Sequence, residues 1–324
     1  MSRLAFIFRT DVHTADRSPD SWKADYPAEI WSNLEQIGEL ARKHDCAAVL
    51  DGGDFFHIKA STRNSHGLVV KVAEIHASYP CPVFSIEGNH DITYNNLESI
   101  DRQPLGVLFA SGVFNLLRDH VFEDGNLKVR VVGMPYKVDR TLQELRAIRK
   151  QEGDTNLIAL VHALAGEKPP DHVEDFFGEP VFRYDRLIAK NGPDCWCFGH
   201  WHRDQGIVEI KGRQFVNQGA VSRGALIKEN LERQPKVALI EVTEEGVTVT
   251  PLPLKVAPAS EVFDVAKKER REKEGAIIEQ FAAKLQASGQ IDPSEDIEAS
   301  VRALGFDADI RDLALEYLER ARSQ

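Results

Sequence analysis

The sequence has no long apolar run and few cysteines. None of its hydrophobic stretches approaches the ~20 residues that a helix needs to span a bilayer, and the N-terminal run Leu4–Phe8 is too short for a signal peptide. The four cysteines lie in or beside predicted core strands, where small apolar side chains pack in a reducing compartment. We therefore expect a protein without a membrane span that acts in the cytoplasm.

Basic residues are fewer than acidic residues. The 40 Lys and Arg residues against 51 Asp and Glu residues give a formal net charge of −11. This charge argues against strong sequence-independent binding to nucleic acid, because such binding depends on basic contacts to phosphates. Bound divalent cations would reverse the sign locally, so a nucleic-acid substrate stays open. The length of 324 residues allows one large α/β domain plus an appendage.

Five short apolar runs are typical of buried strands, and each is followed by residues that can bind metal ions. The runs are Leu4–Phe8, Ala47–Leu50, Val83–Ile86, Leu157–Val161 and Trp196–Phe198. The donors after them are, in order, Asp11 and His13, Asp54, Asn89, His162, and His200 and His202. Sites in open α/β sheets form at the carboxyl ends of strands, so we expect these donors to lie together. Seven oxygen and nitrogen donors are too many for one zinc ion and suit two divalent ions that share a carboxylate.

The segments between these strands predict an α/β fold. Helices expected over Pro27–His44 and about Asn64–Ala77 alternate with the first three strands, which implies parallel neighbours. Further helices are expected over Pro104–Ala110, Thr141–Gln151 and Tyr184–Ala189. Further strands are expected over Val113–Leu117, Leu127–Val132, Gly206–Ile210, Gln214–Val216, Val237–Val242 and Val247–Thr250, with a turn at Glu123–Asn126 between the first two. This pattern favours two sheets packed face to face and flanked by helices.

The composition changes near Ser260, after which helix formers replace strand signals. An apolar stripe of Ile277, Phe281 and Leu285 follows a run of mixed charge. We therefore divide the chain into a domain over residues 1–256, which carries the donors, and a small helical C-terminal region over residues 257–324. The stripe either packs on its own domain or binds a partner helix.

The order of the motifs adds a family resemblance. Asp11-x-His13, Gly53-Asp54, Gly88-Asn89-His90, the strand-end His162 and Gly199-His200-x-His202 together resemble the calcineurin-like metallophosphoesterase superfamily over roughly Leu4 to Leu254. The resemblance implies a four-layer sandwich of two mixed sheets flanked by helices. It also implies that Asp11, His13 and His202 hold one ion, that Asn89, His162 and His200 hold the other, and that Asp54 bridges them. Such ions activate hydroxide for attack on phosphorus. We expect manganese, with iron, zinc or magnesium as alternatives.

Three further residues are candidates for catalysis. In this superfamily the histidine at the position of His90 contacts the phosphate and helps the leaving oxygen depart, which suits an imidazole. Asp91 beside it could orient the ring. His57 follows Asp54 in Gly-Asp-Phe-Phe-His, which resembles an element of the SbcD-like double-strand-break repair nucleases. There this histidine lies near the metals and helps to set up the phosphodiester. A purely structural histidine is the alternative.

These details favour a DNA exonuclease or endonuclease of the SbcD type that acts in DNA repair or recombination. A phosphodiesterase for small nucleotides or RNA ends is the alternative. The acidic charge favours it, as does a C-terminal region that lacks strand signals for the capping domain usual in SbcD-like nucleases. The resemblance implies two partners besides DNA. One is an SbcC-like coiled-coil ATPase, which the C-terminal helices would bind, and the other is a second copy of the chain.

Overall fold

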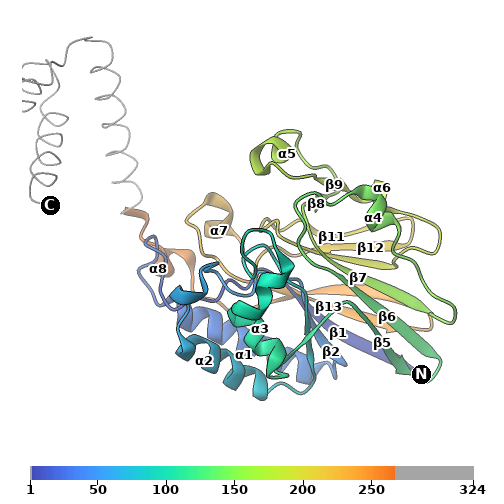
Figure 1. Cartoon of the computed structure of the whole chain (residues 1–324), viewed down its shortest axis with the longest axis horizontal. Helices are drawn as coiled ribbons and strands as arrows, with labels where there is room; N and C mark the ends of the chain where they lie inside the picture. The colour runs from blue at the N-terminus through green and yellow to red at the C-terminus, as the bar shows by residue number, and fades with distance from the viewer. Residues whose placement is uncertain (1, 267–324) are drawn as a thin grey trace, which may run out of the picture. The chain divides into compact units, whose positions relative to one another are not determined.

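Two six-stranded sheets form the framework of the computed structural model, which describes residues 2–266 (Figure 1). The first sheet has the order β14 (Gly246–Pro253), β13 (Lys236–Thr243), β1 (Arg3–Arg9), β2 (Ala48–Asp51), β3 (Val83–Ser85) and β4 (Phe114–Leu116). The second has the order β11 (Gly206–Ile210), β12 (Arg213–Asn217), β10 (Cys195–Gly199), β7 (Asn156–His162), β6 (Leu127–Met134) and β5 (Asp119–Asp124). A separate short pair consists of β8 (Ala165–Gly166) and β9 (Phe182–Arg183).

Both large sheets are mixed. Strands β1 to β4 run parallel, while β13 pairs antiparallel with β1 and with β14. In the second sheet β12, β10, β7 and β6 run parallel, and β11 and β5 add antiparallel edges. The parallel strands at the centre of each sheet therefore end on the same side of it, where polar loops can meet.

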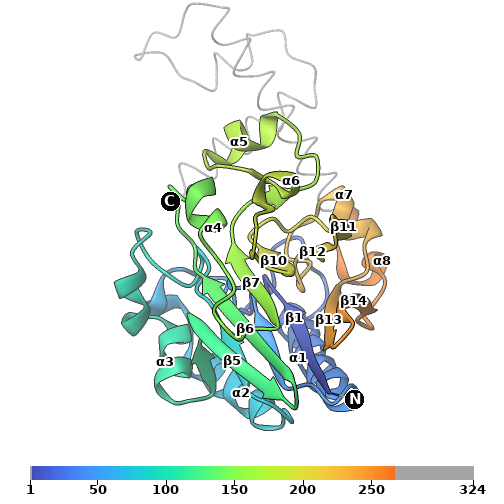
Figure 2. The same ribbon diagram turned by 90° about the vertical axis from the view of Figure 1, so that its right-hand side faces the viewer.

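Helices cover the outer faces of both sheets. The helices are α1 (Tyr26–Lys43), α2 (His66–Ala77), α3 (Pro104–Ala110), α4 (Leu142–Arg146), α5 (His172–Phe177), α6 (Tyr184–Leu187), α7 (Lys228–Glu232) and α8 (Ala259–Val262), with short 3-10 turns over Ser61–Arg63 and Leu97–Arg102. Helices α1 to α3 lie on the first sheet, and α4 and α6 lie on the second (Figures 1 and 2). The predicted four-layer sandwich is confirmed.

The alternation of side chains along β1 explains why both faces of the first sheet are buried. Ala5 and Ile7 pack towards the helices, whereas Phe6 and Phe8 pack between the two sheets. Cys195 and Cys197 share the inner face of β10, with their sulfurs 3.8 Å apart, and both are free thiols in the core. They are plain core residues, as the period-two spacing predicts.

Two predictions about the segments on either side of β6 were wrong. The helix expected over Thr141–Gln151 ends at Arg146, because Ile148 turns into the core and the Lys150 N–H bonds to the Asn191 carbonyl. The turn at Glu123–Asn126 does not connect the strand near Val113 with β6. It joins β6 to β5, an edge strand without an apolar run, while β4 belongs to the other sheet.

The compact unit that carries both sheets runs to Phe263, whose ring lies 5.3 Å from that of Trp22. The predicted helical stripe of Ile277, Phe281 and Leu285 lies outside the described residues. Within residues 2–266, none of the helices is long and apolar enough to cross a membrane.

Candidate metal centre

The predicted donors gather where the central strands of the two sheets end. Asp11 and His13 follow β1, Asp54 follows β2 and Asn89 follows β3 in the first sheet. In the second sheet His162 is the last residue of β7, and His200 and His202 follow β10. The parallel pairing of these strands brings donors that are far apart in the sequence to one place.

The donors form two groups that share one carboxylate. Asp11, His13, Asp54 and His202 have ligand atoms within 4.8 Å of one another, as do Asp54, His162 and His200. Asp54 directs Oδ2 to His13 Nε2 at 3.6 Å and Oδ1 to His162 Nε2 at 3.5 Å. The Asn89 Oδ1 lies 3.2 Å from the same His162 nitrogen, which adds it to the second group. This is the division that the family resemblance implies.

The backbone at the centre is unusual, because four of the donors adopt a positive φ. The values are 53° for Asp11, 49° for His13, 54° for Asp54 and 86° for His200. Residues other than glycine rarely adopt this conformation, and it concentrates at functional sites. Hydrogen bonds from Asp11 N to Gly53 O and from His13 N to Asp54 O hold the loops together. Gly88 is needed here, since a Cβ would overlap the Asp54 carboxylate.

The electrostatics of the centre favour a bound cation. Burial raises the pKa of Asp11 to about 6, and burial lowers the pKa of His13 well below its usual value. Burial would also lower the pKa of His162, but the carboxylates of Asp54 and Asp11 raise it to about 9. A proton on His162 therefore balances the two buried carboxylates. A bound metal ion would supply this positive charge instead.

The donor set fits divalent ions with mixed oxygen and nitrogen ligands. Carboxylate, amide and imidazole donors suit manganese, iron or zinc in open sites, whereas a structural zinc prefers four closed thiolate or imidazole ligands. His162 supports this fit, because its Nδ1 donates to the Gly52 carbonyl at 2.7 Å and leaves Nε2 for an ion.

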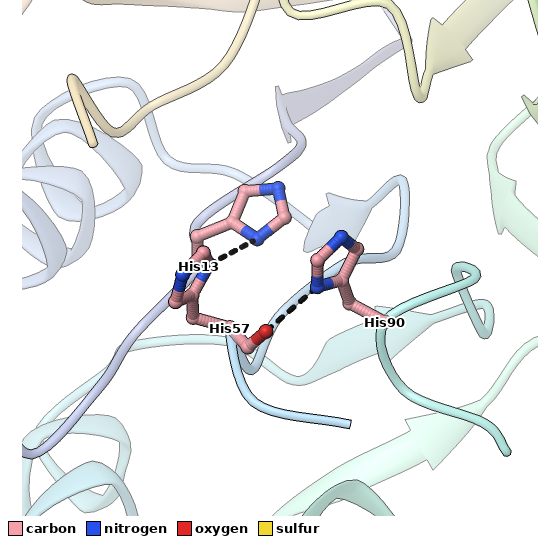
Figure 3. Close-up of side chains that lie close together, drawn as sticks. All are labelled: His13, His57 and His90. Carbon is pink, nitrogen blue, oxygen red and sulfur yellow. Dashed lines mark hydrogen bonds between the residues drawn. The ribbon is translucent and has the colours of Figure 1, made fainter. Parts of the chain in front are cut away.

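Two further histidines complete the centre (Figure 3). His90 Nδ1 donates to the His57 carbonyl at 2.6 Å, which leaves Nε2 free for a substrate. His57 Nδ1 lies 3.4 Å from His13 Nδ1, and its ring stacks on that of His90 with centroids 5.6 Å apart. The structure thus brings His57 and His90 together beside the first donor group.

Asp91 does not orient the His90 ring, contrary to our expectation. It is buried, and its oxygens accept hydrogen bonds from the backbone N–H groups of Phe55, Phe56 and Gly88 at 2.9–3.3 Å. Adjacent residues in this turn point in different directions, so the ring and the carboxylate do not meet. Asp91 instead ties the loop after β2 to the loop after β3.

We expect Asp91→Ala to destabilise the domain by about 3 kcal/mol or more, because three buried N–H donors would lose their acceptor. Asp91→Asn retains one acceptor oxygen and should cost less. Urea denaturation of the metal-free protein measures both effects. The exposed Asp171, which makes no capping hydrogen bond, serves as the matched control. Equal midpoints for Asp91→Ala and Asp171→Ala would contradict this role.

Sequence reasoning missed Glu179, which contacts a predicted ligand. Its Oε2 lies 3.1 Å from His200 Nε2, and its Oε1 accepts a hydrogen bond from the Tyr136 hydroxyl at 2.6 Å. Burial acts to raise the pKa of Glu179, but the hydrogen bonds from His200 and Tyr136, together with the nearby imidazoles of His200 and His162, outweigh burial and lower the pKa. A metal-bound histidine commonly donates its other N–H to a carboxylate, so this contact leaves Nδ1 of His200 to face the ion.

Replacing Glu179 by Ala should weaken the binding of one ion by about 10- to 100-fold, the usual effect of losing such a partner. The other ion should be unaffected, since Asp11, His13 and His202 have no contact with Glu179. Titration of manganese against a chelating dye would resolve two affinities and show which one changes. Tyr136→Phe should give a smaller change of the same kind. Parallel weakening of both ions would argue against a specific role.

The centre opens into a large cleft. The cleft has a volume of about 1420 Å³ and includes His13, Asp54, Asn89, His90, His200 and His202 in its lining. Segments from both sheets form its walls, among them the loop after β1, the loop after β2, α5 and the residues around α7. The donors are thus accessible to a substrate from the cleft.

A catalytic centre of two donor groups around a shared carboxylate, set between two mixed sheets, defines a metal-dependent hydrolase of the two-metal class. The model of the calcineurin-like phosphoesterase family matches residues 4–204. The chain therefore belongs to this family.

Two known proteins are similar to the chain. The DNA double-strand break repair protein Mre11 from Archaeoglobus fulgidus is 22% identical over 236 residues, which cover 68% of this chain and 50% of that protein. A purple acid phosphatase from the seeds of yellow lupin (Lupinus luteus) has a similar structure, with a TM-score of 0.50 and 13% identity over 81% of this chain and 53% of that one. The chain spans about half the length of each, and the second likeness shows the shared fold alone.

Proposed function

We propose that the chain is a metal-dependent DNA nuclease of the SbcD type that acts in DNA repair or recombination. The observation that carries this proposal is the cleft, whose volume of about 1420 Å³ exceeds the ~300–1,000 Å³ of small-molecule sites. The exposed Arg17, Arg63 and Arg203 line it and suit a substrate with several phosphates. The similarity to Mre11 supports the same function.

The contacts of the site support distinct roles for its residues in this proposal. Two divalent ions, when bound by the two donor groups, would supply an activated water and neutralise charge on the phosphate. His90 donates its Nδ1–H to the His57 carbonyl, so its Nε2 can donate a hydrogen bond to the leaving oxygen when the imidazole carries a proton on both nitrogens. The His57 ring packs against both His13 and His90, which supports a role in fixing their orientation and in bordering the phosphodiester.

Several details of the proposal rest on the sequence. We expect manganese to be the activating ion, since the mixed donors suit it. We also expect the protein to act in the cytoplasm, with an SbcC-like ATPase as a partner of the C-terminal region and a second copy of the chain as another.

Manganese-dependent digestion of DNA by the purified chain tests the proposal. End-labelled linear DNA and closed circular DNA would be compared, with methyl p-nitrophenyl phosphate as a small diester. His90→Ala serves as the control for contaminating nucleases. We expect the wild-type chain to digest linear DNA and the variant to lose that activity.

Digestion of the circular substrate would add an endonuclease activity. Hydrolysis of the small diester without any digestion of DNA would contradict the nuclease proposal. It would instead favour a phosphodiesterase for small nucleotides or RNA ends, which the net charge of −11 supports.

A further inference from the structure

Helix α5 presents two phenylalanines to the solvent beside the metal centre. Phe176 is 79% exposed and Phe177 is 38% exposed. Their rings meet edge to face with centroids 5.0 Å apart, and both line the cleft. Two large exposed rings in a cleft rimmed by polar residues are typical of a binding surface.

The two rings are close to the centre and are held there. The Phe177 centroid lies 6.1 Å from that of His200. Val173, one turn before the two phenylalanines in α5, is buried and packs in a small apolar cluster with Leu164 and Trp201. Figures 1 and 2 show α5 at the end of the domain opposite the N-terminus. The anchored helix thus keeps the phenylalanines on the wall of the cleft next to the second donor group.

The part of the cleft wall formed by α5 and Glu179 carries no lysine or arginine. The segment from Asp171 to Glu179 contains four carboxylates, and Glu179 is the one of the four that lines the cleft, so this wall disfavours phosphates. Arg17 and Arg63 lie on the segments after β1 and β2 of the first sheet and line the same cleft, as do Asp16 and Asp20 in the loop of Arg17. A polynucleotide in the cleft would therefore turn its phosphates towards the arginines and its bases towards α5.

We propose that Phe176 and Phe177 form a stacking platform for an unpaired nucleobase next to the scissile phosphate. This inference rests on the proposed nuclease function and specifies its substrate as single-stranded DNA or a frayed end. The faces of a base inside a duplex are covered by its neighbours, so only an unpaired base can stack on a protein ring. Stacking on an aromatic side chain tolerates every base, because each has a π-face, and changes affinity by about 5- to 150-fold per base.

The test compares a single-stranded oligothymidylate with an oligonucleotide of the same length made of abasic residues. Both have the same phosphates, so the ratio of their kcat/KM values isolates the bases. We expect the wild-type chain with manganese to prefer the thymidylate by about tenfold or more. The double variant Phe176→Ala/Phe177→Ala should lose this preference and cleave both substrates at the rate at which the wild-type chain cleaves the abasic one. The double variant Phe176→Tyr/Phe177→Tyr should keep the preference.

Tyr94→Ala is the matched control, because Tyr94 is a fully exposed aromatic residue outside the lining of the cleft. A preference that survives in Phe176→Ala/Phe177→Ala would overturn the platform. Equal wild-type rates on both substrates would also overturn it while leaving the nuclease function intact. Failure of the wild-type chain to cleave either oligonucleotide, with the small diester still hydrolysed, would instead reject the nuclease function and the platform with it.

Discussion

Asp54→Asn is expected to lower kcat/KM for any phosphodiester by roughly 10³-fold or more, because both donor groups lose their shared ligand. Asp54 Oδ1 and Oδ2 face His162 and His13, respectively, and an asparagine amide nitrogen cannot replace a carboxylate oxygen at a cation. The fold should persist, since the asparagine oxygen can still accept the hydrogen bond from the His90 N–H.

Two measurements separate this effect from simple loss of structure. Mass spectrometry of the metals should show fewer than two ions per chain in Asp54→Asn, while circular dichroism stays unchanged. Glu229→Gln is the matched control, because Glu229 is an exposed carboxylate in the lining of the same cleft. Full metal content with full activity in Asp54→Asn would show that the two groups do not share this ligand.

His90→Ala should lower kcat by about 10²- to 10⁴-fold, the range for loss of a positioned acid or base. Its side chain contacts the His57 carbonyl through Nδ1, and the free Nε2 is the atom that we expect to assist the leaving oxygen. The backbone N–H of residue 90 remains in the variant and still bonds to Asp54. We therefore expect metal content to match the wild type.

The readout that distinguishes this role is the leaving group. Diesters with more acidic leaving groups need less help from a proton donor, so the loss in His90→Ala should shrink as leaving-group pKa falls. His172→Ala, at an exposed histidine of the same cleft, is the control. A loss of metal from His90→Ala, or a loss of rate independent of the leaving group, would contradict the assignment.

Much of the fold could be predicted because its central strands are apolar throughout. Runs such as those of β1 and β7 are buried on both faces, and their ends are marked by glycine or polar residues. Strand β5 could not be found in this way, because it lies on the edge of its sheet with mostly exposed side chains. The helix after Thr141 was predicted too long for a different reason, since its end depends on the tertiary contacts of Ile148 and Lys150.

The donors of the site could be predicted because strand order alone brings them together. Contacts of these donors that depend on loop conformation could not be predicted from the sequence. Glu179 reaches His200 from a loop that precedes it by 21 residues, and nothing in the local sequence marks it. Asp91 was given the wrong partner, because proximity in the sequence does not fix the direction of a side chain in a tight turn. Its position between two loops can be seen only in the folded structure.

The most direct test of the two-group centre is a count of manganese ions bound per chain at saturation, combined with the electron paramagnetic resonance spectrum. Two groups that share Asp54 would hold the ions close to each other. We predict two ions per chain and a spectrum of a magnetically coupled pair, which Asp54→Asn abolishes. Binding of one ion at saturation, or two ions with uncoupled spectra, would contradict a centre built around a shared Asp54.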